Sequence, residues 1–409
     1  MKTGLLGRKL GHSYSPQIHA CLGSYSYDLF EKEPDEVETF LKTGDFTAIN
    51  VTIPYKQTVI PFCSELSQTA RRIGAVNTIV RREDGSLIGH NTDYFGFLST
   101  VKHSGLDPYG KKVLVIGNGG ASKPAITVME ELGARVTVIT HKENTPENLR
   151  KHDDAAILVN ATPVGMYPNT GLSPVDLSLF PRLEGVLDMI YNPARTQLLL
   201  DAEERGLITE NGLWMLVAQA KEASEWFTGS PIDDALIGTI HQSLRLQMEN
   251  IILIGMPGSG KSTIGRHLAA KLSKEFVDAD AQIVSAAGMT IPEIFSRSGE
   301  AGFRQIESKV LSDLGKYSGI IIATGGGCVT RECNYAHLHQ NGTIFCLDRQ
   351  LSKLPTDGRP LSQKGKLGEM YRIRHPLYQR FADYTVDNND TPDNCVRQIL
   401  RYLNLGGKV

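Results

Sequence analysis

The stretch Gly255–Ser262 has the residue types and the spacing that hold the phosphates of a nucleotide. It reads Gly-Met-Pro-Gly-Ser-Gly-Lys-Ser and directly follows the apolar run Ile251–Ile254. In a loop of this kind the backbone amides cradle the phosphates, the lysine reaches the β- and γ-phosphates, and the hydroxyl after it ligates Mg²⁺. The residues expected to hold a nucleotide and a Mg²⁺ ion are Gly258, Gly260, Lys261, Ser262 and Thr263.

A second glycine-rich loop lies earlier in the chain, after the apolar run Val113–Ile116. Gly117, Gly119 and the small residue Ser122 have the spacing that brings backbone amides and a helix N-terminus against a pyrophosphate. The pattern predicts a dinucleotide site, because a strand precedes it and a helix follows. The residues expected at the pyrophosphate are Gly117, Gly119, Gly120 and Ala121.

The end of the next predicted strand, Arg135–Thr140, indicates which dinucleotide binds. An NAD enzyme would carry Asp or Glu there to bind the ribose 2′-hydroxyl. This chain has Thr140, His141 and Lys142 instead, which offer a hydroxyl and basic groups. These groups favour a 2′-phosphate, so the sequence predicts NADP(H).

Three polar clusters precede the second loop, at residues 11–16, 49–56 and 74–93. Together they supply hydroxyls, amides, the ammonium of Lys56 and the carboxylate of Asp93. A carbonyl that is being reduced needs a proton as the hydride arrives, and a lysine paired with an aspartate can deliver it. The clusters therefore suit a polyhydroxylated acid beside a hydride donor.

The elements that must position these groups follow an α/β pattern. Short apolar runs alternate with amphipathic stretches, and two of the runs open into glycine loops, so we expect two nucleotide-binding sheets. Asp233 is expected to cap a helix over 233–246, and the domain joint is expected near 247–250. The predicted domains are a substrate domain (1–100, to which helix 233–246 returns), a Rossmann domain (101–232) and a P-loop domain (250–409).

Composition narrows the class of protein. The 409 residues exceed what one core accommodates, and 43 basic residues nearly balance 45 acidic ones without a basic stripe, which argues against nucleic-acid or membrane partners. No apolar run reaches the length of a membrane span, so we expect a soluble cytoplasmic protein. The six cysteines form no metal or disulfide pattern and are assigned no chemistry.

Over about residues 1–245 the ordered motifs resemble the shikimate dehydrogenase family. The resemblance implies that Ser13 and Ser15 bind the substrate carboxylate and that Lys56 and Asp93 are the catalytic pair. It further implies substrate contacts at Asn50, Thr52, Asn77, Asp93, Tyr191 and Gln219, and cofactor contacts at Met189 and Gly212. The family usually has Asn-Arg-Thr where this chain has Thr140, His141 and Lys142, a departure at the 2′-phosphate clamp.

Over about residues 250–400 the chain resembles shikimate kinase. The motifs that carry this resemblance are Val277–Asp280, Gly302–Glu307, Thr324–Gly327, Gly358–Leu361 and Arg374–Tyr378. It implies a five-stranded parallel sheet, Mg²⁺ held by Asp278 through water, and an acceptor hydroxyl polarised by Asp280. It also implies that Arg304 and Arg374 clamp the substrate carboxylate, that Gly326 lies against the ring, and that Arg359 neutralises the transferring phosphoryl group.

Together the two resemblances imply a bifunctional enzyme of the shikimate pathway. The first half would reduce 3-dehydroshikimate to shikimate with NADPH, and the second would phosphorylate shikimate with ATP and Mg²⁺. The alternative is a quinate/shikimate dehydrogenase fused to a nucleotide-binding regulatory module. The expected partners are small-molecule substrates, and the residues predict no particular oligomeric state.

Overall fold

The computed structural model describes residues 1–11, 13–354 and 364–404. The chain divides into two compact units. The first comprises Met1–Met166, Leu172–Tyr191 and Leu198–Ser243. The second comprises Leu244–Val409 and two short segments, Tyr167–Gly171 and Asn192–Gln197.

The N-terminal part of the first unit is built on a mixed six-stranded sheet with the order β2-β1-β3-β5-β6-β4. Along the strand Ala48–Val51, successive side chains point to opposite faces of the sheet. Ile49 packs with side chains of the helices Val37–Thr43 and Gln68–Ile73 on one face, whereas Ala48 contacts Phe227 on the other face. The strands are β1 (Lys2–Gly7), β2 (Ser26–Glu31), β3 (Ala48–Val51), β4 (Glu65–Leu66), β5 (Thr78–Arg81) and β6 (Leu87–His90). The helices are α1 (Ser15–Leu22), α2 (Val37–Thr43), η1 (Ile60–Phe62) and α3 (Gln68–Ile73).

The rest of the first unit carries a five-stranded parallel sheet with the order β11-β10-β9-β7-β8, and the sequence predicted a nucleotide-binding sheet here without its number of strands. Its strands are β7 (Lys112–Ile116), β8 (Arg135–Ile139), β9 (Ile157–Asn160), β10 (Gly185–Asp188) and β11 (Ile208–Glu210). Its helices are α5 (Ser122–Glu131), α6 (Pro146–Leu149), η2 (Arg150–His152), η3 (Leu177–Leu179) and α7 (Gln197–Glu204). Val113 and Val115 face one apolar cluster while Leu114 and Ile116 face the other, which is the near-continuous apolar strand of a sheet covered on both sides.

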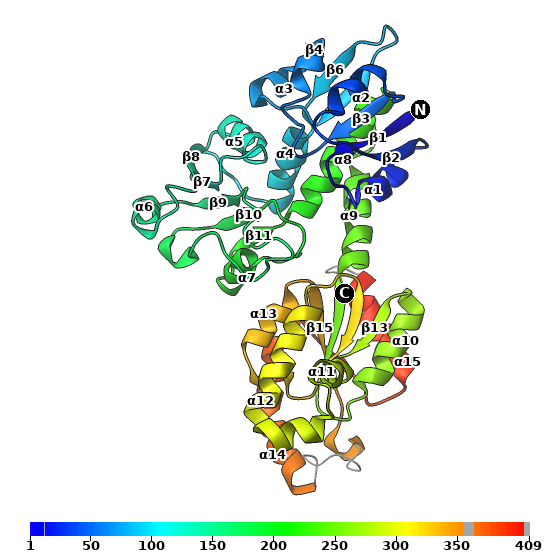
Figure 1. Ribbon diagram of the computed structural model, residues 1–409. Helices are drawn as coiled ribbons and strands as arrows, with labels where there is room; N and C mark the ends of the chain where they lie inside the picture. Colours follow the sequence, from blue (N-terminus) through cyan, green and yellow to red (C-terminus); the bar gives the residue numbers. More distant parts are fainter. Residues whose placement is uncertain (12, 355–363, 405–409) are drawn as a thin grey trace. The chain divides into compact units, whose positions relative to one another are not determined.

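Two long helices complete the first unit, and a third continues from it into the second unit. They are α4 (Asp93–Ser104), α8 (Gly212–Thr228) and α9 (Ala235–Met248). The α4 and α8 helices lie side by side, and α8 also contacts strands of the six-stranded sheet (Figure 1). Asp233 Oδ1 accepts a hydrogen bond from Ala235 N at 2.9 Å, so this residue does cap α9. Leu246 near the end of α9 packs against the core of the second unit.

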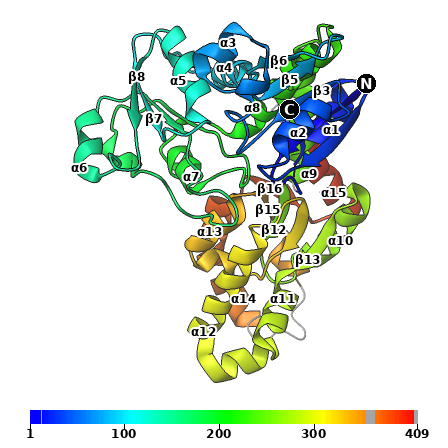
Figure 2. The ribbon, with the colours of Figure 1, turned by 45° about the horizontal axis from the view of Figure 1, so that its top comes forward.

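The second unit is a three-layer α/β domain around a parallel sheet with the order β13-β14-β12-β15-β16, which confirms the predicted five-stranded sheet. Its strands are β12 (Asn250–Ile254), β13 (Glu275–Asp278), β14 (Ile320–Ala323), β15 (Gly342–Asp348) and β16 (Tyr384–Asp387). Its helices are α10 (Lys261–Leu272), α11 (Ala279–Ala287), α12 (Ile291–Leu314), η4 (Cys328–Thr330), α13 (Cys333–His339), η5 (Leu351–Lys353), α14 (Lys364–Phe381) and α15 (Pro392–Asn404). The α10 and α15 helices cover one face of the sheet, and α11 to α14 cover the other (Figure 1 and Figure 2).

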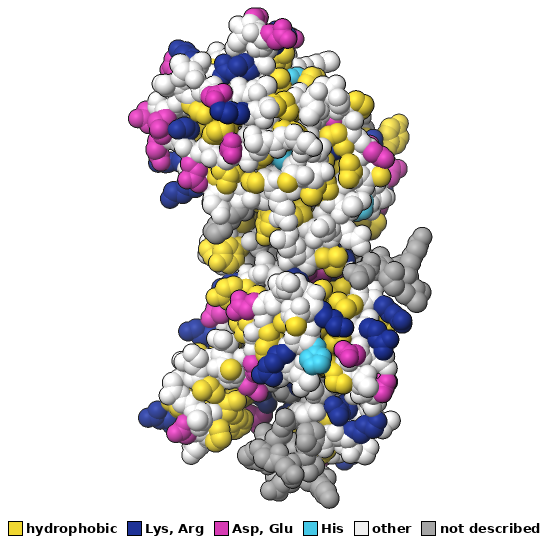
Figure 3. Space-filling model, turned by 90° about the vertical axis from the view of Figure 1, so that its right-hand side faces the viewer, with side chains coloured by type: hydrophobic (Ala, Val, Ile, Leu, Met, Phe, Trp, Pro, Cys, Tyr) yellow, Lys and Arg dark blue, Asp and Glu magenta, His cyan; other side chains and the backbone are white. Residues whose placement is uncertain are grey.

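On the face drawn in Figure 3, basic and acidic side chains are interspersed on each unit. Within the described residues, every helix is too short or too polar to cross a membrane. The six cysteines are free thiols.

Candidate functional sites

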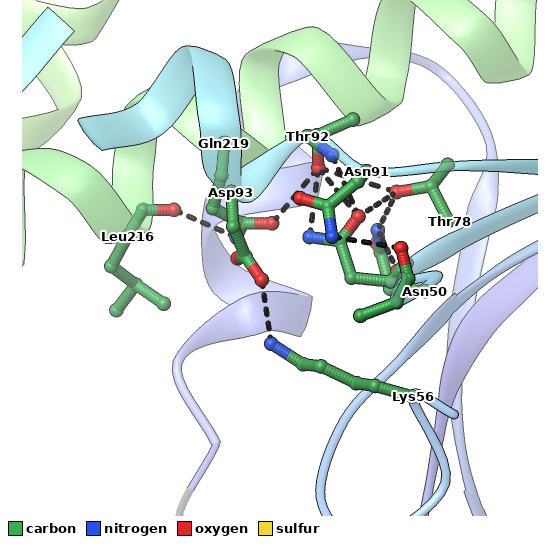
Figure 4. A network of polar contacts seen from close by, with 10 residues as sticks. Asn50, Lys56, Thr78, Asn91, Thr92, Asp93, Leu216 and Gln219 are labelled. Carbon is green, nitrogen blue, oxygen red and sulfur yellow. Dashed lines mark hydrogen bonds and ion pairs between the residues drawn. The ribbon is translucent and has the colours of Figure 1, made fainter. Parts of the chain in front are cut away.

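A lysine and an aspartate from separate segments meet in the first unit. Lys56 Nζ donates to Asp93 Oδ2 at 2.7 Å, and both side chains are mostly buried, with 24% and 13% of their surface exposed. Figure 4 shows the Lys56 ammonium pointing at this carboxylate. Asp93 is the first residue of α4, so the positive end of the helix dipole also favours its charge. The structure therefore brings together the two residues that the sequence predicted as a pair.

A network of neutral polar side chains fixes the segment beside this ion pair. Asn77 Oδ1 accepts from the backbone N of Thr92 at 2.7 Å, which holds the residue just before Asp93. Asn77 Nδ2 donates to Thr92 Oγ1 at 3.1 Å, and Thr78 Oγ1 donates to Asn77 Oδ1 at 3.1 Å. Asn50 Nδ2 donates to Thr78 Oγ1 at 3.1 Å, so the network connects β3, β5 and the segment after β6 (Figure 4). These groups are pre-oriented by one another before a ligand binds.

Tyr27 extends this network and was missed in the sequence. Its hydroxyl donates to Asn50 Oδ1 at 2.8 Å, and its ring stacks on His19 with centroids 4.0 Å apart. Burial raises the pKa of Tyr27 and lowers the pKa of His19 to about 3, so both groups stay neutral near pH 7. Because Tyr27 donates to the amide oxygen, the Asn50 amide nitrogen must point toward Thr78.

A cavity of about 280 Å³ surrounds the Lys56–Asp93 pair and is lined by residues of the six-stranded sheet, of α8 and of the segments that follow β7 and β10. Its lining contains both residues predicted to bind the substrate and residues predicted to bind the cofactor. The predicted residues that line the cavity are Ser13, Ser15, Asn50, Thr52, Lys56, Asn77, Asp93, Ala121, Met189, Tyr191, Gly212 and Gln219. The sequence therefore identified most of this cavity's wall.

The glycine loop before α5 has the backbone that close approach of a phosphate requires. Gly117 has φ 103°, and a Cβ there would lie 2.9 Å from Thr162 Cγ2. By contrast, a Cβ on Gly119 or Gly120 would meet nothing within 4 Å, so these two glycines leave open space in front of the helix N-terminus. A Cβ on Gly212 would lie 2.1 Å from Met189 O, which explains why glycine is needed there.

The turn after β8 holds a carboxylate that the sequence prediction overlooked. Glu143 Oε2 accepts from Thr140 N at 3.0 Å and from Thr140 Oγ1 at 2.7 Å. These hydrogen bonds lower the pKa of Glu143, so the carboxylate is charged. The Thr140 amide and hydroxyl therefore already have an anionic partner within the chain, whereas His141 and Lys142 lie exposed beside it.

In the second unit the phosphate loop has the geometry that its sequence predicted. Gly258 and Gly260 have φ 86° and 95°, and Lys261 begins α10 with its Nζ donating to the carbonyl of Gly255 at 2.9 Å. Ser262 Oγ donates to Asp278 Oδ2 at 2.8 Å. The hydroxyl and carboxylate oxygens of these two residues suit Mg²⁺, which binds one or two protein oxygens and keeps several waters.

Beside the loop lies a cavity of about 820 Å³ that contains the predicted acceptor residues. Arg304 Nη1 bonds Glu307 Oε2 at 2.7 Å and Nη2 bonds Glu300 Oε1 at 3.2 Å. Glu307 is 1% exposed, and burial raises its pKa while the Arg304 guanidinium opposes that rise. Arg374 Nη1 donates to the carbonyl of Gly326 at 3.1 Å. The predicted residues that line this cavity are Gly258, Gly260, Lys261, Ser262, Thr263, Asp278, Asp280, Arg304, Gly326 and Arg374.

The three glycines after β14 are required by close neighbours. A Cβ on Gly325 would lie 2.8 Å from Asp280 Oδ1, one on Gly326 would lie 2.7 Å from Pro257, and one on Gly327 would lie 2.1 Å from Arg304 Nη2. A side chain on Gly325 or Gly327 would therefore displace a predicted acceptor residue, and one on Gly326 would displace the phosphate loop. Glu307 was missed as a site residue, although it lies in a motif already used. Arg359, predicted to neutralise the phosphoryl group, lies outside the described residues.

Comparison with known families assigns each half separately. The model of the shikimate dehydrogenase substrate binding domain matches residues 5–79, and the model of shikimate kinase matches residues 257–404. A shikimate dehydrogenase (NADP⁺) of Caldicellulosiruptor bescii is 37% identical over 259 residues, which cover 55% of this chain and 89% of that protein.

Solved structures give the same result for the first unit. Shikimate dehydrogenase 1 of Peptoclostridium difficile is 37% identical with a TM-score of 0.54, covering 60% of this chain and 98% of that chain. A Thermus thermophilus shikimate 5-dehydrogenase, solved in complex with NADP(H) and shikimate, is 31% identical with a TM-score of 0.54. The match covers 59% of this chain and 99% of that chain.

Proposed function

Because the chain belongs to the shikimate dehydrogenase family and also carries a shikimate kinase domain, we propose that it catalyses two consecutive reactions on one substrate. The first is the NADPH-dependent reduction of 3-dehydroshikimate to shikimate. The second is the phosphorylation of shikimate by ATP to shikimate 3-phosphate. The hydroxyl made by the first reaction is the nucleophile of the second.

In the first reaction, Lys56 protonates the carbonyl oxygen as it becomes an alkoxide. The Lys56–Asp93 contact of 2.7 Å supports this role, since the carboxylate orients the ammonium and stabilises its charge. Asn50, Asn77 and Thr52 offer neutral donors and acceptors for ring hydroxyls, and the hydroxyls of Ser13 and Ser15 serve the substrate carboxylate. The nicotinamide supplies the hydride when it is bound.

The cofactor binds along the glycine loop of the Rossmann domain. Gly117, Gly119, Gly120 and Ala121 present backbone amides to the pyrophosphate, and Thr140, His141 and Lys142 face the adenosine ribose. Met189 and Gly212 border the nicotinamide side. The single observation that carries this proposal is the cavity that the predicted cofactor residues Ala121, Met189 and Gly212 line together with the Lys56–Asp93 pair.

In the second reaction, Asp280 binds the acceptor hydroxyl and Arg304 and Arg374 clamp the substrate carboxylate. Guanidinium groups fix a carboxylate through paired hydrogen bonds, and the phosphoryl transfer itself needs mainly positioning and positive charge. Lys261 and the loop amides hold the phosphates, while Ser262, and Asp278 through water, would hold Mg²⁺, which would neutralise phosphate charge when bound. Arg359 remains a predicted participant on the basis of its motif alone.

A coupled assay of the whole chain tests the proposal. Supplied with 3-dehydroshikimate, NADPH and Mg-ATP, the chain should oxidise NADPH and accumulate shikimate 3-phosphate. Without ATP the reaction should stop at shikimate, and without NADPH nothing should form. Oxidation of NADPH without any phosphorylated product, even from added shikimate, would leave the second half as a nucleotide-binding module.

A further inference from the structure

Arg349 is a cationic side chain in the kinase cavity to which no motif assigned a role. It is the first residue after β15 and lines the cavity together with Gly260 and Lys261 of the phosphate loop. Its side chain is half-buried, and its Nε is fully buried without a hydrogen-bond partner among the described residues. A guanidinium with unused donors in such a place is suited to a ligand oxyanion.

The backbone on both sides of Arg349 is held in place. Asn388 N donates to Asp348 O at 2.8 Å, and Gln350 N donates to Asn389 Oδ1 at 2.8 Å. Asn388 is itself buried, and its Nδ2 donates to the Ser259 carbonyl in the phosphate loop at 2.6 Å. Arg349 is therefore fixed relative to the loop through the turn after β16.

The guanidinium lies close to the point where the loop meets α10. Nη1 of Arg349 is 3.6 Å from the position that a Cβ on Gly260 would occupy. Gly260 directly precedes Lys261, and the amides at this point of a phosphate loop face the phosphates. A nearby lysine is engaged differently, because Lys353 Nζ donates to the carbonyl of Asn389 at 2.7 Å.

We infer that Arg349 is a further nucleotide-binding residue of the kinase, whose guanidinium binds oxygens of the phosphate chain beside Lys261. The inference rests on the proposed kinase function for its ligand, ATP. Arginine suits this task because its planar donors match phosphate oxygens and its charge persists at all working pH values. Contact with the adenine base is the competing assignment.

Inorganic tripolyphosphate separates the two assignments, because it has the phosphate chain without the nucleoside. The full chain and its Arg349→Ala, Arg349→Lys and Arg397→Ala variants are titrated by calorimetry with Mg-ATP and with Mg-tripolyphosphate. Arg397 is a matched control, being an exposed arginine of the same unit that bonds Asn394. We expect Arg349→Ala to weaken both ligands by about 10-fold or more, the usual effect of losing a charged hydrogen bond. Arg349→Lys should lose less, and Arg397→Ala should match the unsubstituted chain.

Other results would overturn the inference. Weaker ATP binding with unchanged tripolyphosphate binding would assign Arg349 to the nucleoside, and unchanged binding of both ligands would remove it from the site. A rise in the KM for shikimate equal to that for ATP would indicate a general structural role. If the unsubstituted chain binds Mg-ATP but does not phosphorylate shikimate, the proposed function fails, while the titrations still decide the role of Arg349.

Discussion

The two cavities that we propose as binding sites for the same small acid differ in the chemistry of their lining residues. In the dehydrogenase cavity, neutral amides and hydroxyls bond one another, and Lys56–Asp93 is the ion pair among the described lining residues. In the kinase cavity, cations from the phosphate loop, α12 and α14 converge with two aspartates and a buried glutamate. The first cavity is about 280 Å³ and the second about 820 Å³.

This difference between the cavities matches the amount of charge that each reaction must stabilise. Reduction of a ketone changes one oxygen and needs one proton, so a pre-oriented neutral network with one ion pair is enough. Transfer of a phosphoryl group between oxygens spreads negative charge over the site, which requires several cations. Before substrates bind, Arg304 is paired with Glu307 and Lys261 with loop carbonyls. We infer that ligands in the kinase cavity exchange partners with the chain, whereas ligands in the dehydrogenase cavity join an existing network.

The largest expected effect separates acceptor chemistry from nucleotide binding in the kinase. Asp280→Asn should reduce phosphorylation by about 10³-fold, within the range for loss of a positioned acid–base group, and should leave reduction by the other half unchanged. Arg374→Ala should likewise abolish phosphorylation through loss of the carboxylate clamp. Rates of both reactions and the Kd for ATP are measured, with the exposed Asp393→Asn as control. A variant that loses ATP affinity in place of turnover would reassign these residues to the nucleotide.

A smaller effect is expected in the first cavity. Lys56→Ala should slow reduction of 3-dehydroshikimate by at least about 10²-fold, because the protonating group is lost, while phosphorylation of shikimate is untouched. Asp93→Asn should act in the same direction. The control is Lys111→Ala, which removes an exposed pair with Glu184 elsewhere in the first unit. Unchanged reduction by Lys56→Ala would disprove the assignment of Lys56.

The cofactor preference should respond to one carboxylate. We expect NADPH to be preferred over NADH, and Glu143→Gln to increase that preference about 5-fold, since the repulsion between this carboxylate and a 2′-phosphate is removed. The measurement is kcat/KM for both cofactors. Glu147→Gln is the matched control, an exposed carboxylate in the first turn of α6. An unchanged NADPH to NADH ratio in Glu143→Gln would show that this carboxylate does not face the 2′-phosphate.

The sequence predicted those site residues that stand in short motifs, because the neighbouring residues indicate their chemistry. Lys56, Asp93 and the glycine loops stand in short motifs, so the sequence predicted the residues that the structure brings together at the two cavities, and the apolar runs predicted both parallel sheets. Tyr27 was missed because its partner Asn50 lies 23 residues away and a tyrosine in a strand usually packs. Glu143 had a local signal, since Thr140 and Glu143 have the spacing of a capping box. The basic residues between them favoured the interpretation as a 2′-phosphate site instead.

The smallest effect is expected from cutting the chain between its two enzymes. The sequence placed the joint near 247–250, but the compact units divide between Ser243 and Leu244, because Leu246 packs in the second core. We therefore expect fragments 1–243 and 244–409, expressed separately, to keep kcat and KM within about 2-fold, which corresponds to about 0.5 kcal/mol.

A cut after Met248 is the comparison, and it should destabilise the kinase fragment, because that fragment loses Leu246 and its apolar contacts. Either cut leaves residues 167–171 and 192–197 on the first fragment, although they belong to the second compact unit. The melting temperature of 244–409 should therefore fall before its kcat does, since every predicted catalytic residue of the kinase remains on it. A fragment that folds but is inactive, and regains activity when the other is added, would show that one active site takes groups from the other half.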